Sequence, residues 1–129
     1  MIFKSVLVVD DSAVSRAILR KYLLSIKPYW MCVEVRNGED ALAVARDIQF
    51  DLAIVDINMP GISGLDAACS LKLAQPNLVI SILTADSREI VKNRAKNLTI
   101  HFFEKPINKA KARAIAALVD GEDDLFDAI

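Results

Sequence analysis

The chain has 129 residues, about the size of one domain with a single hydrophobic core. Apolar residues make up 53% of the sequence, yet no apolar stretch approaches the ~20 residues of a membrane span, and no basic segment leads into an apolar secretory signal. The formal net charge of −1 excludes the strongly basic balance of most nucleic-acid-binding domains. We therefore expect a cytoplasmic protein with no membrane span and no direct contact with nucleic acid.

The first part of the chain alternates between short apolar runs and amphipathic stretches. The run at residues 6–9 predicts a strand buried on both faces, and the apolar stripe over 13–25 predicts a helix that Ser12 can cap. A second strand is expected at 31–35, and a second helix at 38–48 after an Asn-Gly turn.

The remaining elements continue the same alternation. They are, in chain order, a strand at 51–55, a helix at 64–74, a strand at 78–83, a helix at 87–96, a strand at 100–103 and a helix at 108–119. Strands that alternate with helices of this length predict right-handed βαβ units and a parallel sheet covered on both faces. The fold class is therefore α/β, and no linker divides the chain into two domains.

The charges are unevenly distributed along the chain. Five of the 17 acids lie in the last ten residues, which leaves 12 acids and 16 bases in residues 1–119. These five are Asp120, Glu122, Asp123, Asp124 and Asp127. We expect one folded domain over residues 1–120, followed by a short acidic tail at 121–129. The two cysteines, Cys32 and Cys69, lack metal-site spacing and are expected to be reduced, buried or partly buried thiols.

Chemically useful side chains follow four of the predicted strands. Asp10 and Asp11 come after the first strand, Asp56 after the third, Thr84 after the fourth and Lys105 after the fifth. Because the carboxyl ends of parallel strands meet at one edge of a sheet, these residues are expected to lie close together. Three carboxylates, a hydroxyl and an ammonium suit a divalent metal and a phosphoryl group.

Each residue also has an ordinary structural interpretation. Asp10 and Asp11 are favourable at a helix N-terminus, where acids meet the positive end of the helix dipole. Asp56 and Thr84 could be strand-end residues that bond to nearby backbone, and Lys105 could be a solvated lysine. The functional alternative is that Asp56 is a nucleophile that forms an acyl phosphate beside a Mg²⁺ ion.

The motifs together resemble the receiver domain of two-component response regulators, the family of CheY-like proteins. The segments that carry the resemblance are Val8–Ser12 (VVDDS), 37–42 (NGEDAL), 56–64 (DINMPGISG), 83–85 (LTA) and 105–106 (KP). They occur in the family's order and spacing over residues ~5–119. The resemblance implies a flavodoxin-like, doubly wound (βα)5 fold with a five-stranded parallel sheet of strand order 2-1-3-4-5.

The resemblance also implies a role for each site residue. Asp56 would accept a phosphoryl group from a sensor histidine kinase or a phosphotransfer protein. Mg²⁺ would be bound by Asp11, Asp56 and the Asn58 carbonyl, with Asp10 acting through water. Thr84 and Lys105 would bind the phosphoryl group, and Thr84 with Phe102 would switch a protein-binding face. The domain would act mainly as a signalling switch, and whether it catalyses its own phosphorylation and dephosphorylation is open.

The partner face is expected on the fourth and fifth helices and the last strand. Its expected residues are Arg88, Lys92, Lys96, Phe102, Lys109 and Arg113. These bases recur every four residues along each helix, so they describe either ordinary solvated faces or a ridge that docks an acidic segment. That segment could belong to a downstream protein or be the acidic tail, whose apolar residues Leu125, Phe126 and Ile129 could anchor it.

The chain departs from the family in one loop. Leu98-Thr99 stand where many receivers have Gly-Ala, and Asn97 is expected to take the left-handed backbone conformation there instead. His101, the single histidine, is expected to be an ordinary edge residue. The output is open between a stand-alone receiver and the receiver of a longer regulator with a DNA-binding or enzymatic domain.

Two other classes are less compatible with the residues. A flavodoxin would hold the FMN phosphate after the first strand, where Asp10 and Asp11 would repel it. A haloacid-dehalogenase-type phosphatase needs a second aspartate two residues after its nucleophile, where this chain has Asn58.

Overall fold

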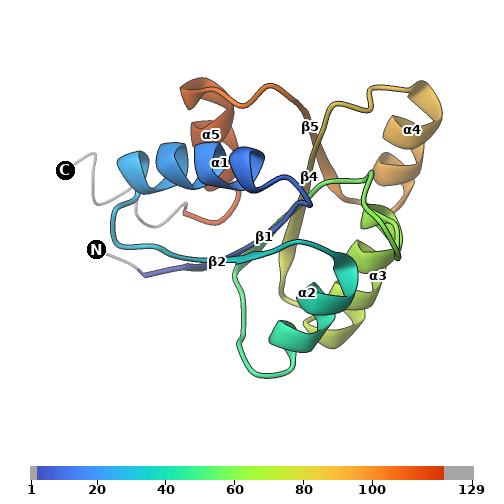
Figure 1. Cartoon of the computed structure of the whole chain (residues 1–129), viewed down its shortest axis with the longest axis horizontal. Coiled ribbons are helices and arrows are strands. Elements are labelled where there is room, and N and C mark those ends of the chain that lie inside the picture. The colour runs from blue at the N-terminus through green and yellow to red at the C-terminus, as the bar shows by residue number, and fades with distance from the viewer. Residues whose placement is uncertain (1–2, 121–129) are drawn as a thin grey trace.

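The computed structural model describes residues 3–120, which form a five-stranded parallel sheet flanked by five helices (Figure 1). The strands are β1 (Ser5–Val9), β2 (Met31–Val35), β3 (Leu52–Val55), β4 (Val79–Thr84) and β5 (His101–Glu104). The helices are α1 (Ala13–Ile26), α2 (Gly38–Ala45), α3 (Gly64–Ala74), α4 (Glu89–Asn97) and α5 (Lys109–Ala116). The strand order β2-β1-β3-β4-β5 confirms the expected doubly wound fold.

The helices cover the sheet from both sides. Helices α1 and α5 pack on one face with Val6 and Val8 of β1, while α2, α3 and α4 pack on the other with Leu7 and Val9 (Figure 1). Successive side chains of a strand point to opposite faces, so a strand in the middle of the sheet must be apolar throughout. This explains the unbroken apolar runs of β1 and β3.

The helix starts follow the sequence closely because side chains cap them. The oxygens of Ser12, Asn37, Ser63 and Asn108 each accept a hydrogen bond from the backbone N–H three residues later, at the start of α1, α2, α3 and α5. Helix α4 has Arg88 at its N-cap without a side-chain hydrogen bond and begins two residues later than expected.

Two helices end earlier than the sequence predicts. Helix α2 ends at Ala45 because the N–H groups of Arg46 and Asp47 turn to the carbonyl oxygens of Ala43 and Val44, tightening the last turn. Helix α5 similarly ends at Ala116 and not at residue 119. Within residues 3–120, no helix combines the length and the hydropathy needed to cross a bilayer.

The left-handed residue after α4 is Thr99, with φ of 59°, so the expectation for Asn97 is wrong. The N–H of Thr99 donates to Lys96 O (3.0 Å) and that of Ile100 to Ala95 O (2.9 Å). This pair of bonds is a Schellman motif, which requires the left-handed conformation two residues beyond the last helical residue. Asn97 is that last helical residue and keeps helical geometry.

Both cysteines are free thiols, as expected, and both are half-buried. Burial raises the pKa of the Cys32 thiol to about 11, an effect that the nearby Arg20 partly offsets. Cys32 therefore stays protonated and unreactive at neutral pH.

Candidate functional site

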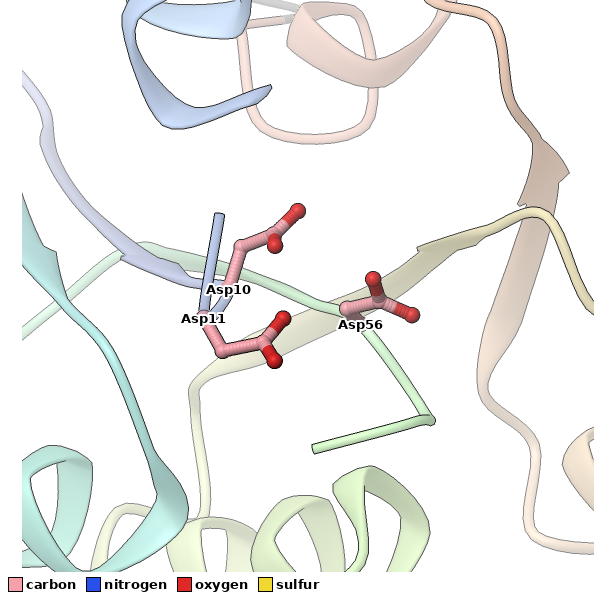
Figure 2. A group of neighbouring side chains, drawn as sticks. All are labelled: Asp10, Asp11 and Asp56. Carbon is pink, nitrogen blue, oxygen red and sulfur yellow. The ribbon is translucent and has the colours of Figure 1, made fainter. Parts of the chain in front are cut away.

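Three carboxylates meet at the carboxyl edge of the sheet (Figure 2). Asp10, Asp11 and Asp56 each place one carboxylate oxygen within 4.8 Å of the others. Asp10 and Asp56 are buried, and Asp11 is exposed. The convergence expected from strand order is confirmed, although the three residues come from two separate segments of the chain.

The sheet fixes two of these acids through its hydrogen bonds. The N–H of Asp56 donates to Val9 O (2.9 Å), and the N–H of Asp10 donates to Val35 O (3.2 Å), so each acid continues the ladder beyond its strand. One oxygen of each carboxylate then organises the following loop. Asp10 Oδ1 accepts from Ser12 N–H (2.9 Å), and Asp56 Oδ1 accepts from Asn58 N–H (3.3 Å).

Lys105 bridges the two buried acids. Its Nζ donates to Asp10 Oδ2 (2.8 Å) and Asp56 Oδ2 (3.0 Å), with Ser15 Oγ at 3.4 Å. Burial disfavours the charge on Lys105, but the hydrogen bonds to Asp10 and Asp56 outweigh it and raise the pKa of Lys105. The lysine is therefore a fixed positive charge at the site and not a solvated surface residue.

Thr84 lies at the end of β4, next to Lys105 in the sheet. The N–H of Lys105 donates to Thr84 O (2.8 Å), which extends the β4–β5 pairing past the last strand residue. The Thr84 side chain is buried, and its Oγ1 accepts from the N–H of Asp86 (3.2 Å). Its hydroxyl hydrogen is free to donate, because this bond uses the oxygen as an acceptor.

Asn58 lies in the loop directly after Asp56, where a carbonyl ligand was expected. Its side-chain Nδ2 donates to Asp86 Oδ2 (3.4 Å). Asp86 also pairs with Arg88, whose Nη2 lies 2.8 Å from Asp86 Oδ2. The hydrogen bond from Arg88 lowers the pKa of Asp86 to about 2. These contacts connect the loop that follows β3 to the loop that follows β4.

The expected partner-face residues surround β5, which is an edge strand. Phe102 is half-buried and packs against the core cluster on the α4 side of the sheet. In the β4–β5 pairing it lies opposite Ile82, two residues before Thr84. Lys92 of α4 pairs with Glu104 of β5 at 2.7 Å. The exposed bases are Arg88, Lys96, Lys109 and Arg113. Because α4 and α5 cover opposite faces of the sheet, the two helical rows lie on either side of β5.

Three residues, Ser15, Arg16 and Asp86, make contacts at the site that were not foreseen from the sequence. Ser15 Oγ lies near Lys105 Nζ. Asp86 accepts a hydrogen bond from Asn58 Nδ2, and its own N–H donates to Thr84 Oγ1. The Arg16 guanidinium donates to Asp10 O (2.6 Å) and Glu34 Oε1 (3.2 Å). Ser15 lies one helical turn after Ser12, and this spacing could have indicated it. The Arg16 contacts depend on the pairing of β1 with β2, so no pattern in the sequence around Arg16 indicates them.

The donor set suits a hard divalent cation. All three side chains of the cluster offer carboxylate oxygens, the ligands that Mg²⁺ prefers, and the exposed Asp11 leaves room for water. The cluster already attracts a cation, since the Lys105 ammonium contacts two of its acids. The residues present therefore fit Mg²⁺. Lys105 and Thr84 lie on the side of this acidic cluster that faces β4 and β5.

The sequence matches the response regulator receiver domain family over residues 6–117. The chemotaxis protein CheY of Thermotoga maritima is 30% identical over 106 residues, covering 78% of this chain and 88% of that protein. A cyclic di-GMP phosphodiesterase of the same species is 32% identical over 105 residues, 81% of this chain, but the chain spans only 27% of its length.

A solved structure shows the same architecture. The response regulator protein TrrA of Thermotoga maritima, in complex with Mg²⁺-BeF, superposes with a TM-score of 0.77 and 29% identity, covering 90% of this chain and 98% of that chain. The range matched by the family includes every residue of the candidate site from Asp10 to Lys105. The chain belongs to the response regulator receiver domain family.

Proposed function

We propose that Asp56 accepts a phosphoryl group from a phosphohistidine of a sensor kinase or phosphotransfer protein, and that Mg²⁺ is required. The observation that carries this proposal is the meeting of three carboxylates with the Lys105 ammonium at one sheet edge. Membership of the receiver family supports it. The same membership supports a cytoplasmic location.

Each residue then has a defined part in the transfer. An oxygen of the Asp56 carboxylate attacks phosphorus, the P–N bond to the donor imidazole breaks, and the imidazole leaves with a proton. Lys105 and the Thr84 hydroxyl each bind a phosphoryl oxygen and so orient the group on Asp56. Asp11, Asp56 and the Asn58 carbonyl would hold Mg²⁺, with Asp10 acting through water. When bound, Mg²⁺ would offset the repulsion between the carboxylates and the anionic phosphoryl group.

The test uses a small phosphodonor. Acetyl phosphate with Mg²⁺ is expected to add one phosphoryl group per chain, detected by intact mass, and an excess of chelator is expected to remove the effect. Equal uptake with and without Mg²⁺ would contradict the proposed metal requirement.

The metal ligands can be tested separately from the chemistry. Asp11→Asn is expected to weaken Mg²⁺ binding by roughly tenfold or more, because an amide oxygen lacks the charge of the carboxylate it replaces. Titration calorimetry would measure the affinity directly. Asp47→Asn, which neutralises an exposed acid outside the cluster, is the matched control and should bind Mg²⁺ like the parent. Equal affinities of the two variants would remove Asp11 from the ligand set.

We propose that phosphorylation switches the region of α4, β5 and α5 through Thr84 and Phe102. Thr84 moves towards the phosphoryl group, and the Phe102 ring fills the space it leaves, which shifts an existing equilibrium. Further burial of an aromatic ring contributes on the order of 1–3 kcal/mol, enough to change populations about tenfold. The half-buried ring of Phe102 has surface left to bury.

Removal of the Thr84 hydroxyl tests this route. Beryllofluoride, a tetrahedral phosphoryl analogue, is expected with Mg²⁺ to shift amide NMR signals of α4, β5 and α5 in the parent and in Thr84→Ser. Thr84→Val keeps the shape but not the hydroxyl, and we expect only small shifts in this variant. Shifts of full size in Thr84→Val would show that the signal does not pass through Thr84.

The signalling output depends on which protein binds the switched face of α4, β5 and α5. We propose that Arg88, Lys92, Lys96, Lys109 and Arg113, with Phe102, contact a downstream protein. Residues 1–120 would be the receiver and 121–129 an acidic tail. The similarity to CheY supports a stand-alone signalling protein. The similarity to the much longer phosphodiesterase supports a receiver joined to an output domain.

A further inference from the structure

The peptide group that links Asp10 to Asp11 is held by an arginine. Arg16 Nη1 donates to Asp10 O at 2.6 Å, and Arg16 Nε donates to Glu34 Oε1 at 3.2 Å. Only 17% of the Arg16 side chain is exposed, so water competes little for these two bonds. The guanidinium holds its N–H donors in one rigid plane, and two of them here reach acceptors from different parts of the sheet. Arg16 therefore connects the turn after β1 to the edge strand β2.

Arg16 reaches this turn because of its place in α1. The helix begins at Ala13, so residue 16 is in the first turn, and helical side chains lean towards the N-terminus of their helix. Glu34 pairs with Val8 across the β1–β2 ladder, and Val8 packs in the core cluster that includes α1. Paired residues of parallel strands share a face, so Glu34 stands on the α1 side of the sheet, where it meets Arg16.

The polar atoms of Asp10 all have partners, whereas the Asp11 carboxylate has none among residues 3–120. Besides Asp10 O, which Arg16 binds, the partners of the N–H, Oδ1 and Oδ2 of Asp10 are, in that order, Val35 O, Ser12 N–H and Lys105 Nζ. The Asp11 carboxylate nevertheless points towards Asp56 (Figure 2). The backbone must set this direction, and the Asp10 carbonyl fixes the plane of the peptide that precedes Asp11.

We propose that Arg16 is a positioning residue for Mg²⁺. By binding the Asp10 carbonyl, it orients the peptide before Asp11 and so keeps the Asp11 carboxylate directed at the place of the ion. Glu34 holds the guanidinium against this carbonyl. The proposal rests on the Mg²⁺ site proposed above and adds to it a residue that acts through Asp11.

The charge of Arg16 alone predicts the opposite effect. A guanidinium near three carboxylates lowers their attraction for a divalent cation, so a purely electrostatic role means that Mg²⁺ binds more tightly when Arg16 is made neutral. A cation is also unfavourable near the N-terminus of a helix, where the helix dipole is positive. The sign of the change in Mg²⁺ affinity therefore separates positioning from charge.

Titration calorimetry with Mg²⁺ measures this affinity without any phosphoryl transfer. Arg16→Met, which keeps an unbranched apolar stem, is expected to weaken Mg²⁺ binding by roughly tenfold, as loss of a group that orients a metal ligand usually does. Arg16→Lys is expected to lie between this variant and the parent, because an ammonium keeps the charge but not the planar fork that reaches both acceptors.

Arg20→Met is the matched control. Arg20 lies one turn further along α1 and binds the other oxygen of Glu34, with its Nη1 3.3 Å from Glu34 Oε2, but it makes no contact with Asp10 within the described chain. This variant should bind Mg²⁺ like the parent. The amide NMR signal of Asp11, recorded without Mg²⁺, should move in Arg16→Met and stay in place in Arg20→Met.

The Mg²⁺ dependence of phosphoryl uptake from acetyl phosphate gives a second readout. Arg16→Met should need roughly tenfold more Mg²⁺ for half of its maximal rate, because the weaker site fills later. At saturating Mg²⁺ its rate should stay within about twofold of the parent, since Asp56, Thr84 and Lys105 are unchanged.

The outcomes distinguish positioning from stability and from charge. Mg²⁺ affinity in Arg16→Met that equals or exceeds that of the parent would overturn the proposal. Equal losses in Arg16→Met and Arg20→Met would also overturn it, because the effect would not depend on the contact with Asp10. If Arg16→Met fails to fold, Arg16→Lys decides, and parental affinity in that variant is the contradicting result. A failure of Asp56 to accept a phosphoryl group would leave the calorimetric comparison intact, so the two proposals fail separately.

Discussion

Asp56→Asn is expected to lower the rate of phosphoryl uptake by about a thousandfold or more. The amide is a neutral, weak nucleophile, but it has the shape of the carboxylate and can still accept the hydrogen bond from Asn58 N–H. The fold should therefore survive while the chemistry is lost. The measurement is the time course of phosphoryl incorporation from acetyl phosphate with Mg²⁺, followed by intact mass.

The control for this variant is Asp47→Asn, which makes the same chemical change at an exposed position. It should incorporate phosphoryl groups at the rate of the parent. Uptake by Asp56→Asn at the parental rate would remove Asp56 as the acceptor, whatever the state of the metal site.

Gly64→Ala is expected to destabilise the protein by about 3 kcal/mol and to impair phosphoryl uptake as well. Gly64 begins α3, and its N–H donates to Ile57 O (3.0 Å). A Cβ at this position would overlap the carbonyl oxygen of Asp56 and lie 2.7 Å from Ile57 Cα. Both are backbone atoms, so the loop that positions the acceptor would have to move. Urea denaturation gives the loss of stability.

Gly38→Ala is the matched comparison, because Gly38 is likewise the first residue of a helix. A Cβ there would lie 3.1 Å from Ala67 Cβ and 3.3 Å from Ile62 Cβ, which is tight but involves side chains. The higher helix propensity of alanine offsets part of this strain, so we expect a change within about 1 kcal/mol. Equal losses of stability in the two variants would show that contact with the acceptor loop is not the reason why position 64 requires glycine.

The sequence predicted the architecture because strand and helix signals were strong and consistent. Residues 6–9 of β1 and 52–55 of β3 are all apolar, which only a strand covered on both sides tolerates. Once the sheet is parallel, Asp10, Asp56 and Lys105 are expected at one edge, and the strand order that the receiver resemblance implies brings them close together. The convergence of these residues was therefore predictable, even though 95 positions separate Asp10 from Lys105.

Other details depend on contacts that no local pattern encodes. The left-handed residue after α4 is a threonine because the Schellman hydrogen bonds fix its position, and the intrinsic preference of Asn97 does not decide it. The Lys27–Asp120 pair requires α1 and α5 to pack side by side on one face of the sheet. The hydrogen bond from Asn58 to Asp86 requires two loops to meet after β3 and β4 are paired.

The most direct measurement locates the phosphoryl group on the chain. The protein would be phosphorylated with acetyl phosphate and Mg²⁺ and treated with borohydride, which reduces an aspartyl phosphate to homoserine. Peptide mass spectrometry would then identify the reduced residue. We expect homoserine at position 56 and unmodified aspartate at positions 10 and 11, with no reduction when a chelator replaces Mg²⁺. Homoserine at position 10 or 11, or a phosphoryl group that resists borohydride on the single histidine, His101, would contradict the assignment of Asp56 as the acceptor.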